Sequence, residues 1–145
     1  MKIRILLVDD EKEFMQTFAK RLISRNFDVT TAYSGEEAIE KLREYNYDVA
    51  IIDVLMPGIS GIDTLKKIKE IKPLTEAIML TGHATVETAI QGMKLGAYDY
   101  LMKPCKIDVL IDKINGAYER KAQQEERIRK ALAEKLSTSP MSVLR

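Results

Sequence analysis

The sequence predicts one α/β domain built on a parallel, doubly wound sheet, followed by a helical extension at the C-terminus. Short apolar runs alternate with segments of helical period, which is the pattern of five β/α units. The runs are continuously apolar, as expected for strands that helices cover on both faces. With 145 residues the chain can form a hydrophobic core of its own. We expect residues 1–120 to form the domain and residues 121–145 to form a helical tail or a truncated linker.

The expected strands lie at residues 3–8, 28–32, 49–52, 77–81 and 98–102. A strand order of 2-1-3-4-5 would place the first and third strands side by side, where the order of the sheet reverses. Ligands of such sheets bind at the carboxyl ends of the strands beside that point. The residues that follow the first and third strands are therefore the first candidates for a site.

The first helix is expected over residues 12–26, with apolar residues at spacings of three and four that face the core. These residues are Phe14, Met15, Phe18, Ala19, Leu22 and Ile23. Before the second helix, Ser34 and Glu37 have the spacing of a capping box, which would satisfy two free backbone N–H groups. The inward face of that helix carries Ala38, Ile39 and Leu42.

The later helices are recognised by the same apolar spacing. Leu65 and Ile68 mark the third helix, which ends before Pro73. The fourth helix carries Val86, Ala89, Ile90 and Met93, and the core face of the fifth carries Ile107, Leu110, Ile111 and Ile114. The methionines at 56, 79, 93 and 102 are expected to fill the core and not to form a cofactor site.

Charge and cysteine content exclude several classes of protein. Residues 1–116 carry 16 Lys and Arg against 18 Asp and Glu, and residues 117–145 carry 7 against 4, so only the tail is basic. Such a balance argues against a strongly basic nucleic-acid binder. The single Cys105 excludes an internal disulfide, and the lack of a Cys/His cluster excludes an ordinary zinc site. We expect a cytoplasmic chain without a membrane span, because no apolar run approaches about 18 residues.

Polar residues at the ends of three strands suggest phosphoryl chemistry on a carboxylate. Asp9 and Asp10 follow the first apolar run, Asp53 follows the third, and Lys103 follows the fifth. Carboxylate oxygens are the ligands that Mg²⁺ prefers, and a lysine ammonium can pair with a carboxylate or a phosphoryl group. An Asp-Asp pair alone would more often cap the next helix. The second acidic strand end at Asp53 favours the metal site.

The loop after Asp53 contains Pro57, Gly58 and Gly61, which indicate a compact turn before the third helix. Such a loop would keep backbone groups close to Asp53. Thr81 ends the fourth strand and offers a hydroxyl, although threonine is also an ordinary strand residue.

Four stretches combine these residues: Val8-Asp-Asp-Glu11, Asp53-Val-Leu-Met-Pro-Gly58, Thr81-Gly-His-Ala84 and Tyr100-Leu-Met-Lys-Pro104. In order, spacing and residue type they resemble the motifs of two-component response-regulator receiver (CheY-like) domains, over residues 3 to about 118. The resemblance is greatest to receivers of transcription activators, including the AAA+ type. It implies a flavodoxin-like (βα)5 fold and a role in phosphorelay signal transduction and transcription regulation.

The resemblance also implies roles for individual residues. Asp53 would accept a phosphoryl group from a sensor histidine kinase, and slow self-dephosphorylation would be the only further reaction. Mg²⁺ would be held by Asp10, Asp53 and the backbone carbonyl of Leu55, with Asp9 acting mostly through a metal-bound water. Lys103 would pair with the phosphoryl group.

Thr81 and Tyr100 would form the switch of such a receiver. The Thr81 hydroxyl would close onto a phosphoryl oxygen, and Tyr100 would turn inward behind it. Alone, Tyr100 would be read as a core residue. His83, two residues after Thr81, is either an ordinary loop histidine or a side chain that affects the lifetime of the phosphoaspartate. Cys105 stands where receivers often have phenylalanine, as a small packing residue.

The tail from 117 to 136 is rich in strong helix formers, and Asn115-Gly116 is the expected place for a break. A coiled-coil seam through the tail would be polar at Lys121 and Gln124, so we interpret it as a charged, marginal helix. It is either a solvated helix or a signalling helix that joins a dimer to an output domain. Residues 137–140 are expected to be a flexible terminus or the start of a linker. Dimerisation on phosphorylation is expected.

Three alternative functions make different demands on the sequence. A stand-alone phosphotransfer receiver without output stays open. A phosphohydrolase with Asp53 as nucleophile would need a second carboxylate two residues on, where the chain has Leu55. A nucleotide or flavin binder would need a phosphate-binding loop after the first strand, where Asp9, Asp10 and Glu11 would repel phosphate.

Overall fold

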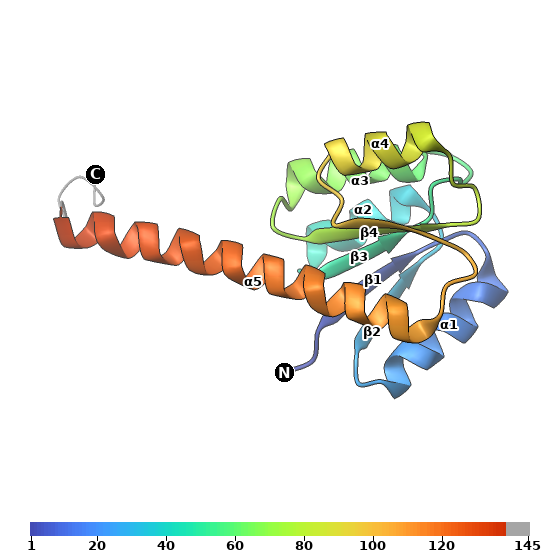
Figure 1. The fold of residues 1–145 in the computed structure, drawn as a ribbon, viewed down its shortest axis with the longest axis horizontal. Coiled ribbons are helices and arrows are strands. Elements are labelled where there is room, and N and C mark those ends of the chain that lie inside the picture. The colour runs from blue at the N-terminus through green and yellow to red at the C-terminus, as the bar shows by residue number, and fades with distance from the viewer. Residues whose placement is uncertain (139–145) are drawn as a thin grey trace.

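A parallel five-stranded sheet lies at the centre of the structure, a computed structural model that describes residues 1–138 (Figure 1). The strands follow the order β2-β1-β3-β4-β5, as the sequence predicted. Their bounds are β1 (Arg4–Val8), β2 (Asp28–Ala32), β3 (Val49–Ile52), β4 (Glu76–Thr81) and β5 (Asp99–Met102). Each lies within one residue of its expected position.

Helices cover both faces of the sheet and make a three-layer domain (Figure 1). They are α1 (Lys12–Ser24), α2 (Gly35–Glu44), α3 (Gly61–Ile71), α4 (Val86–Lys94) and α5 (Ile107–Thr138). Helices α1 and α5 lie on one face, and α2, α3 and α4 lie on the other. No helix among the described residues has the length and apolar character needed to cross a membrane.

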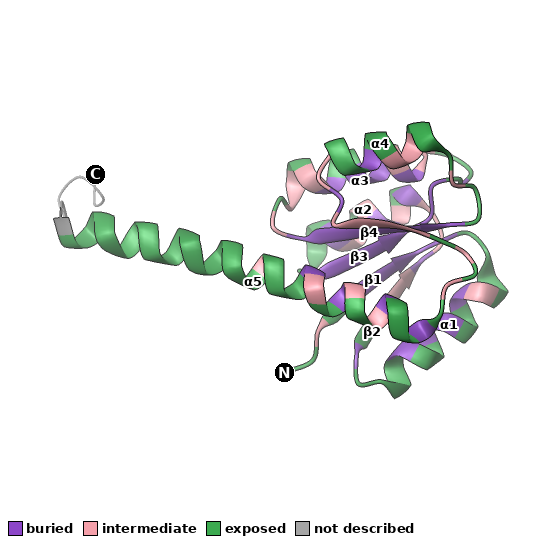
Figure 2. Cartoon of the chain, viewed as in Figure 1, coloured by how far each residue is buried: buried purple, intermediate pink, exposed green. Residues whose placement is uncertain are grey.

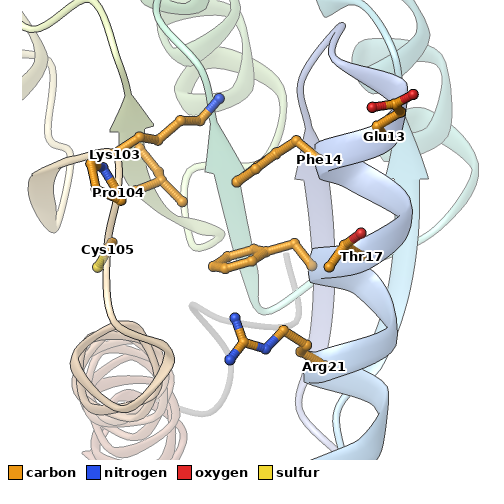
Figure 3. Close-up of a pocket in the computed structure, with 9 residues that line it drawn as sticks. Glu13, Phe14, Thr17, Arg21, Lys103, Pro104 and Cys105 are labelled. Atoms are coloured by element: carbon orange, nitrogen blue, oxygen red, sulfur yellow. The ribbon is translucent and has the colours of Figure 1, made fainter.

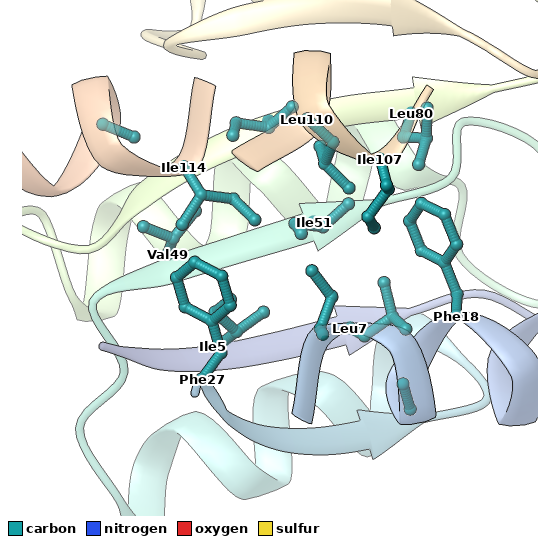
Figure 4. Packing of buried hydrophobic residues seen from close by; sticks show 14 of the residues in the cluster. Ile5, Leu7, Phe18, Phe27, Val49, Ile51, Leu80, Ile107, Leu110 and Ile114 are labelled. Carbon is teal, nitrogen blue, oxygen red and sulfur yellow. The ribbon is translucent and has the colours of Figure 1, made fainter. Parts of the chain in front are cut away.

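The core is divided between the two faces because successive side chains of a strand point in opposite directions. Ile5 and Leu7 of β1 pack toward α1 and α5, while Leu6 and Val8 pack toward α2 and α3. Figure 4 shows the first of these clusters, where α5 side chains meet those of β1 and β3. These four residues of β1 are each at most 1% exposed, so the strand is packed on both sides.

Two expectations for α1 and α2 need correction. The α1 stripe is buried except at its edges: Ile23 is 52% exposed, and Phe14 is half-buried. At the start of α2, Ser34 Oγ accepts a hydrogen bond from the Glu37 N–H, as expected. The Glu37 carboxylate, however, accepts from the N–H of Tyr33, one residue earlier than a capping box requires.

Helix α4 buries little of its surface against the rest of the domain. Gly92 is its single buried residue, while Val86, Ile90 and Met93 are 77%, 50% and 47% exposed. Met102 on the edge strand β5 is also exposed, so the expectation that the methionines fill the core is wrong for Met93 and Met102. It is right for those at 56 and 79. The edge of the sheet offers too little surface to cover these side chains.

Helix α5 continues without interruption through Asn115 and Gly116, so the expected break there is wrong. A Cβ at Gly116 would lie 2.2 Å from Tyr98 Oη. The glycine is therefore needed because Tyr98 lies against the helix at this point. Beyond it, α5 projects from the domain and is largely exposed (Figure 2). The flexible terminus expected at 137–140 begins in the helix, since α5 includes residues 137 and 138, and the rest lies outside the described residues.

Two adjacent side chains of α5 form ion pairs at the amino ends of strands β3 and β4. Arg120 forms an ion pair with Glu76, donates to the Gly96 carbonyl at 3.2 Å, and lies 4.9 Å above the Tyr98 ring. Lys121 Nζ lies 3.2 Å from Asp48 Oδ1. Lys121, the first residue of the expected tail, is thus in contact with the domain.

Candidate functional site

Asp9 and Asp53 lie at neighbouring strand ends because β1 and β3 pair directly. The N–H of Asp53 donates to the Val8 carbonyl at 3.0 Å, and the N–H of Asp9 donates to the Ala32 carbonyl at 3.1 Å. Both side chains are almost fully buried, with 2% of each residue exposed. The parallel ladder therefore fixes the backbone of two carboxylates side by side.

Asp10 joins this pair from the exposed side. One carboxylate oxygen from each of Asp9, Asp10 and Asp53 can be chosen so that all three lie within 4.8 Å of one another. The Asp53 Oδ1 atom is buried and has no hydrogen-bond partner among residues 1–138. A buried carboxylate oxygen without a partner is costly, and a divalent cation would satisfy it. The donor set fits Mg²⁺, which prefers oxygen ligands.

Lys103 places a positive charge beside Asp9, Glu11 and Asp53. Its Nζ donates to Asp9 Oδ2 at 2.6 Å and to Glu11 Oε1 at 3.2 Å, and lies 3.7 Å from Asp53 Oδ2. The ammonium also lies 4.1 Å from the centre of the Phe14 ring, which faces it from α1 (Figure 3). A cation over an aromatic face is attracted by the ring.

The pKa values reflect this crowding. Burial raises the pKa of Asp9, and the charge of Asp53 adds to the effect, although the hydrogen bonds from Lys103 and the Glu11 N–H oppose it. Burial alone would lower the pKa of Lys103. The hydrogen bond to Asp9 and the charges of Asp9 and Asp53 outweigh burial and raise it. Lys103 therefore remains a fixed cation at the site.

The loop after Asp53 is compact, as the sequence predicted. The N–H of Gly61 donates to the Val54 carbonyl at 2.8 Å. A Cβ at Gly61 would lie 1.9 Å from the Asp53 carbonyl oxygen, so only glycine permits this approach. Gly58 has a φ of +81°, a conformation that favours glycine. Both glycines shape the loop that returns to Asp53.

A hollow of about 490 Å³ lies over the acidic cluster. It is lined by Asp10, Glu11, Asp53, Leu55, Met56, Pro57 and His83. A second hollow, of about 380 Å³, lies on the other side of Lys103, between α1 and the segment that contains Pro104 and Cys105 (Figure 3). Lys103 thus forms part of the wall between the acidic site and the α1 surface.

The expected switch residues are near the site but not bonded to it. Thr81 is fully buried at the end of β4, and its Oγ1 accepts a hydrogen bond from the His83 N–H at 3.0 Å. Tyr100 is half-buried on β5, and its hydroxyl lies 2.6 Å from Thr88 Oγ1. Within the described residues, neither hydroxyl forms a hydrogen bond with Asp53.

Three residues at or near the site had no assigned role in the sequence analysis. The sequence predicts Phe14 as a core residue and Glu11 as a motif residue whose charge would repel phosphate, and it predicts no role for Thr88. The spacing of Phe14 matches a core position, and nothing in the sequence indicates that Lys103 lies over its ring. The position of Thr88, three residues after Thr85, is a helix-cap signal that could have been found.

The match to a known family decides the identity of this site. Residues 5–115 match the family described as response regulator receiver domain. The chain belongs to the receiver domain family. A receiver domain is a phosphoacceptor in signalling and not a classical enzyme, and the acidic cluster at residues 9, 10 and 53 is typical of the receiver Mg²⁺ site.

Receivers of transcriptional regulators are among the similar proteins. The transcriptional regulatory protein ZraR of Salmonella typhimurium (strain LT2) is 38% identical over 116 residues, which cover 80% of this chain and 26% of ZraR. The transcriptional regulatory protein TrcR of Mycobacterium tuberculosis is 32% identical over 123 residues, which cover 85% of this chain and 48% of TrcR. The chain therefore spans about a quarter to a half of these relatives.

Solved receiver structures have the same fold. A receiver domain from Clostridium thermocellum superposes with a TM-score of 0.80 at 39% identity, covering 84% of this chain and 98% of that one. A CheY-like receiver from Methanospirillum hungatei JF-1 has a TM-score of 0.82 at 27% identity and covers 86% and 99% of the two chains. The flavodoxin-like (βα)5 fold of this receiver is thereby confirmed.

Proposed function

We propose that this receiver accepts a phosphoryl group on Asp53 from a sensor histidine kinase of a two-component system. The main support is the difference between the two buried carboxylates. Asp9 has both oxygens occupied, by Lys103 and by the Glu11 N–H. Asp53 has one oxygen 3.7 Å from Lys103 and one without any partner among the described residues. Of these two carboxylates, only Asp53 combines burial with an oxygen that has no partner among the described residues.

In the proposed transfer, an oxygen of Asp53 attacks the phosphorus of the kinase phosphohistidine. The new P–O bond forms as the P–N bond breaks, and the electron pair of that bond stays on the histidine nitrogen, which takes up a proton. Lys103 is a cation near Asp53 that would pair with the incoming negative charge. Its bonds to Asp9 and Glu11 hold the ammonium ready for that role.

The residues proposed to hold Mg²⁺ are Asp10, Asp53 and the backbone carbonyl of Leu55, with Asp9 acting mostly through a metal-bound water. The clustering of the three carboxylates and the unpartnered Asp53 Oδ1 support this assignment. Bound Mg²⁺ would offset the charge of the phosphoryl group. Thr81, whose hydroxyl oxygen is held by the His83 N–H, is proposed to donate its hydrogen to a phosphoryl oxygen after transfer.

Regulation of transcription is the proposed output, because ZraR and TrcR are both named transcriptional regulatory proteins. In this proposal the chain itself turns over no substrate beyond slow loss of its own phosphoryl group. A cytoplasmic location remains a prediction of the sequence.

Intact mass after incubation with acetyl phosphate and Mg²⁺ tests the acceptor. The wild type should gain one phosphoryl group, and Asp53→Asn should gain none. Asp63→Asn, an exposed aspartate on α3, should react like the wild type. A chelator should abolish the uptake because the carboxylates would then repel the phosphoryl donor. Uptake by Asp53→Asn would show that the acceptor assignment is wrong, and continuous release of phosphate from a monoester would favour a phosphohydrolase.

A further inference from the structure

Both hydroxyls of the proposed switch form hydrogen bonds with the segment that runs from the end of β4 into the first turn of α4. The oxygen of Thr81 accepts from the His83 N–H, and the hydroxyl of Tyr100 lies 2.6 Å from Thr88 Oγ1. Thr88 lies in the first turn of α4, where it also caps the helix together with Thr85. The structure therefore shows Tyr100 attached to α4 and away from Asp53.

Thr88 Oγ1 has polar neighbours on both elements. It accepts a hydrogen bond from the Thr85 N–H at 3.2 Å and lies 2.9 Å from Thr85 Oγ1 and 3.1 Å from the Thr85 carbonyl oxygen. On the other side it lies 2.6 Å from the Tyr100 hydroxyl, and either hydroxyl of this pair can be the donor. At 2.6 Å this is a short O–H···O hydrogen bond.

This bond matters because little else attaches α4 to the sheet. Gly92, which lacks a side chain, is the only buried residue of the helix. The Tyr100 ring passes beside it, 3.6 Å from where a Cβ would lie. Among residues 1–138, the bond between Thr88 and Tyr100 is the only side-chain hydrogen bond that joins α4 to a strand. Any inward movement of the Tyr100 hydroxyl must break it.

We propose that Thr88 is a positioning residue that holds Tyr100 in its unphosphorylated position and so sets how readily the receiver switches. The inference rests on the proposed function, because it assigns a regulator to the same switch. A net hydrogen bond of ordinary strength corresponds to about a two- to tenfold change in the equilibrium between two positions of Tyr100. The state that Thr88 stabilises is the one shown by the structure.

The first experiment measures amide hydrogen exchange of α4 in the unphosphorylated protein. Tyr100→Phe, which leaves the helix cap intact, and Thr88→Val should each speed exchange across Val86–Lys94 by about two- to tenfold. The double variant should exchange no faster than Thr88→Val, and Thr88→Ser should resemble the wild type. Thr85→Val, which removes the cap residue but keeps the bond, should affect only the first turn. Unchanged exchange in Tyr100→Phe, or additive effects, would overturn the proposal.

The second experiment measures binding of beryllofluoride, which stands in for the phosphoryl group, in the presence of Mg²⁺. Because the analogue binds the switched state, Thr88→Val should bind it about two- to tenfold more tightly than the wild type, and Thr88→Ser should not. Equal or weaker binding by Thr88→Val would contradict the role of Thr88. Failure of the wild type itself to bind would count against the proposed function alone, and the exchange experiment would still decide the role of Thr88.

Discussion

Gly61 controls the position of Asp53 through a single close contact. A Cβ there would lie 1.9 Å from the Asp53 carbonyl oxygen and 2.7 Å from Val54 Cα. Neither atom can move without shifting the backbone that carries the proposed acceptor. At Gly82, on the other side of the site, a Cβ would meet nothing within 4 Å. The two glycines next to the site therefore have opposite tolerance to substitution.

Gly61→Ala is expected to lower the free energy of unfolding by more than about 2 kcal/mol and to reduce phosphoryl uptake, because the backbone must move to accept the methyl group. Gly82→Ala is the matched control and should change stability by less than about 0.5 kcal/mol. Urea unfolding and intact mass measure the two effects. Equal stability of the two variants would mean that the loop adapts without cost.

His83 is an exposed residue that lines the hollow over Asp53. Across that hollow, Leu55 offers only an apolar side chain. We expect His83→Ala to shorten the lifetime of the phosphoaspartate a few-fold, because a smaller side chain gives water easier access to the phosphorus. Loss of the phosphoryl group from purified phosphoprotein, followed over time, measures this. An unchanged rate of phosphoryl loss would show that His83 is a loop residue without an effect on the phosphoaspartate.

At the scale of elements, α5 depends on contacts at the opposite end of the strands from the acidic cluster. Arg120 and Lys69 both pair with Glu76, whose side chain is only 7% exposed. Burial would raise the pKa of Glu76, but the hydrogen bonds and charges of Arg120 and Lys69 outweigh it and hold the pKa below the usual value of 4.5. The ionised carboxylate is thus the form that the folded protein favours.

The sign of the pH dependence follows from this lowered pKa. Its contribution to stability is fully present above the unfolded value of about 4.5 and is lost as the pH falls through the lower folded value. Arg120→Met should therefore cost about 1–2 kcal/mol near neutral pH and progressively less below pH 4.5. Arg129→Met, which breaks an exposed pair with Glu126, is the matched control and should leave the stability nearly unchanged at every pH. A pH-independent difference for Arg120→Met would contradict this account.

At the scale of the whole molecule, the chain combines a domain whose sheet is covered by helices on both faces with a helix that projects from it. The exposed part of α5 carries Ile128, Leu132 and Leu136 at spacings of four, each between 41% and 52% exposed. Helix α4 adds a separate exposed apolar group, at Val86, Ile90 and Met93. Apolar side chains grouped in this way are typical of contact surfaces.

Light scattering tests whether phosphorylation controls assembly. The molar mass of the wild type should rise toward that of a dimer when beryllofluoride and Mg²⁺ are added. Asp53→Asn should show no rise, because it lacks the acceptor oxygen. An unchanged wild-type mass would favour the alternative of a receiver that transfers phosphate without assembling. A rise in the molar mass of both proteins would show that dimer formation does not depend on Asp53.

The sequence by itself determined the five strands and the meeting of Asp9, Asp53 and Lys103 at the carboxyl ends of those strands. Continuous apolar runs identify buried strands, and parallel strands end at one edge, so the polar residues that follow them must meet. These are local patterns combined with a topological rule. The same reasoning explains why the acidic site could be expected before any coordinates were known.

Only the tertiary structure decided how individual side chains are used. In the sequence, Gly116 predicts the end of a helix. In the structure it lies within α5, where the Tyr98 side chain occupies the position that a Cβ would take. The sequence predicts Met93 as a core residue, yet it is exposed because α4 lies at the edge of the sheet. The bond between Thr88 and Tyr100 joins residues from different elements. The spacing of apolar residues predicts which face of a helix or strand is apolar. Whether a side chain on that face is buried, exposed or hydrogen-bonded depends on the element that packs against it.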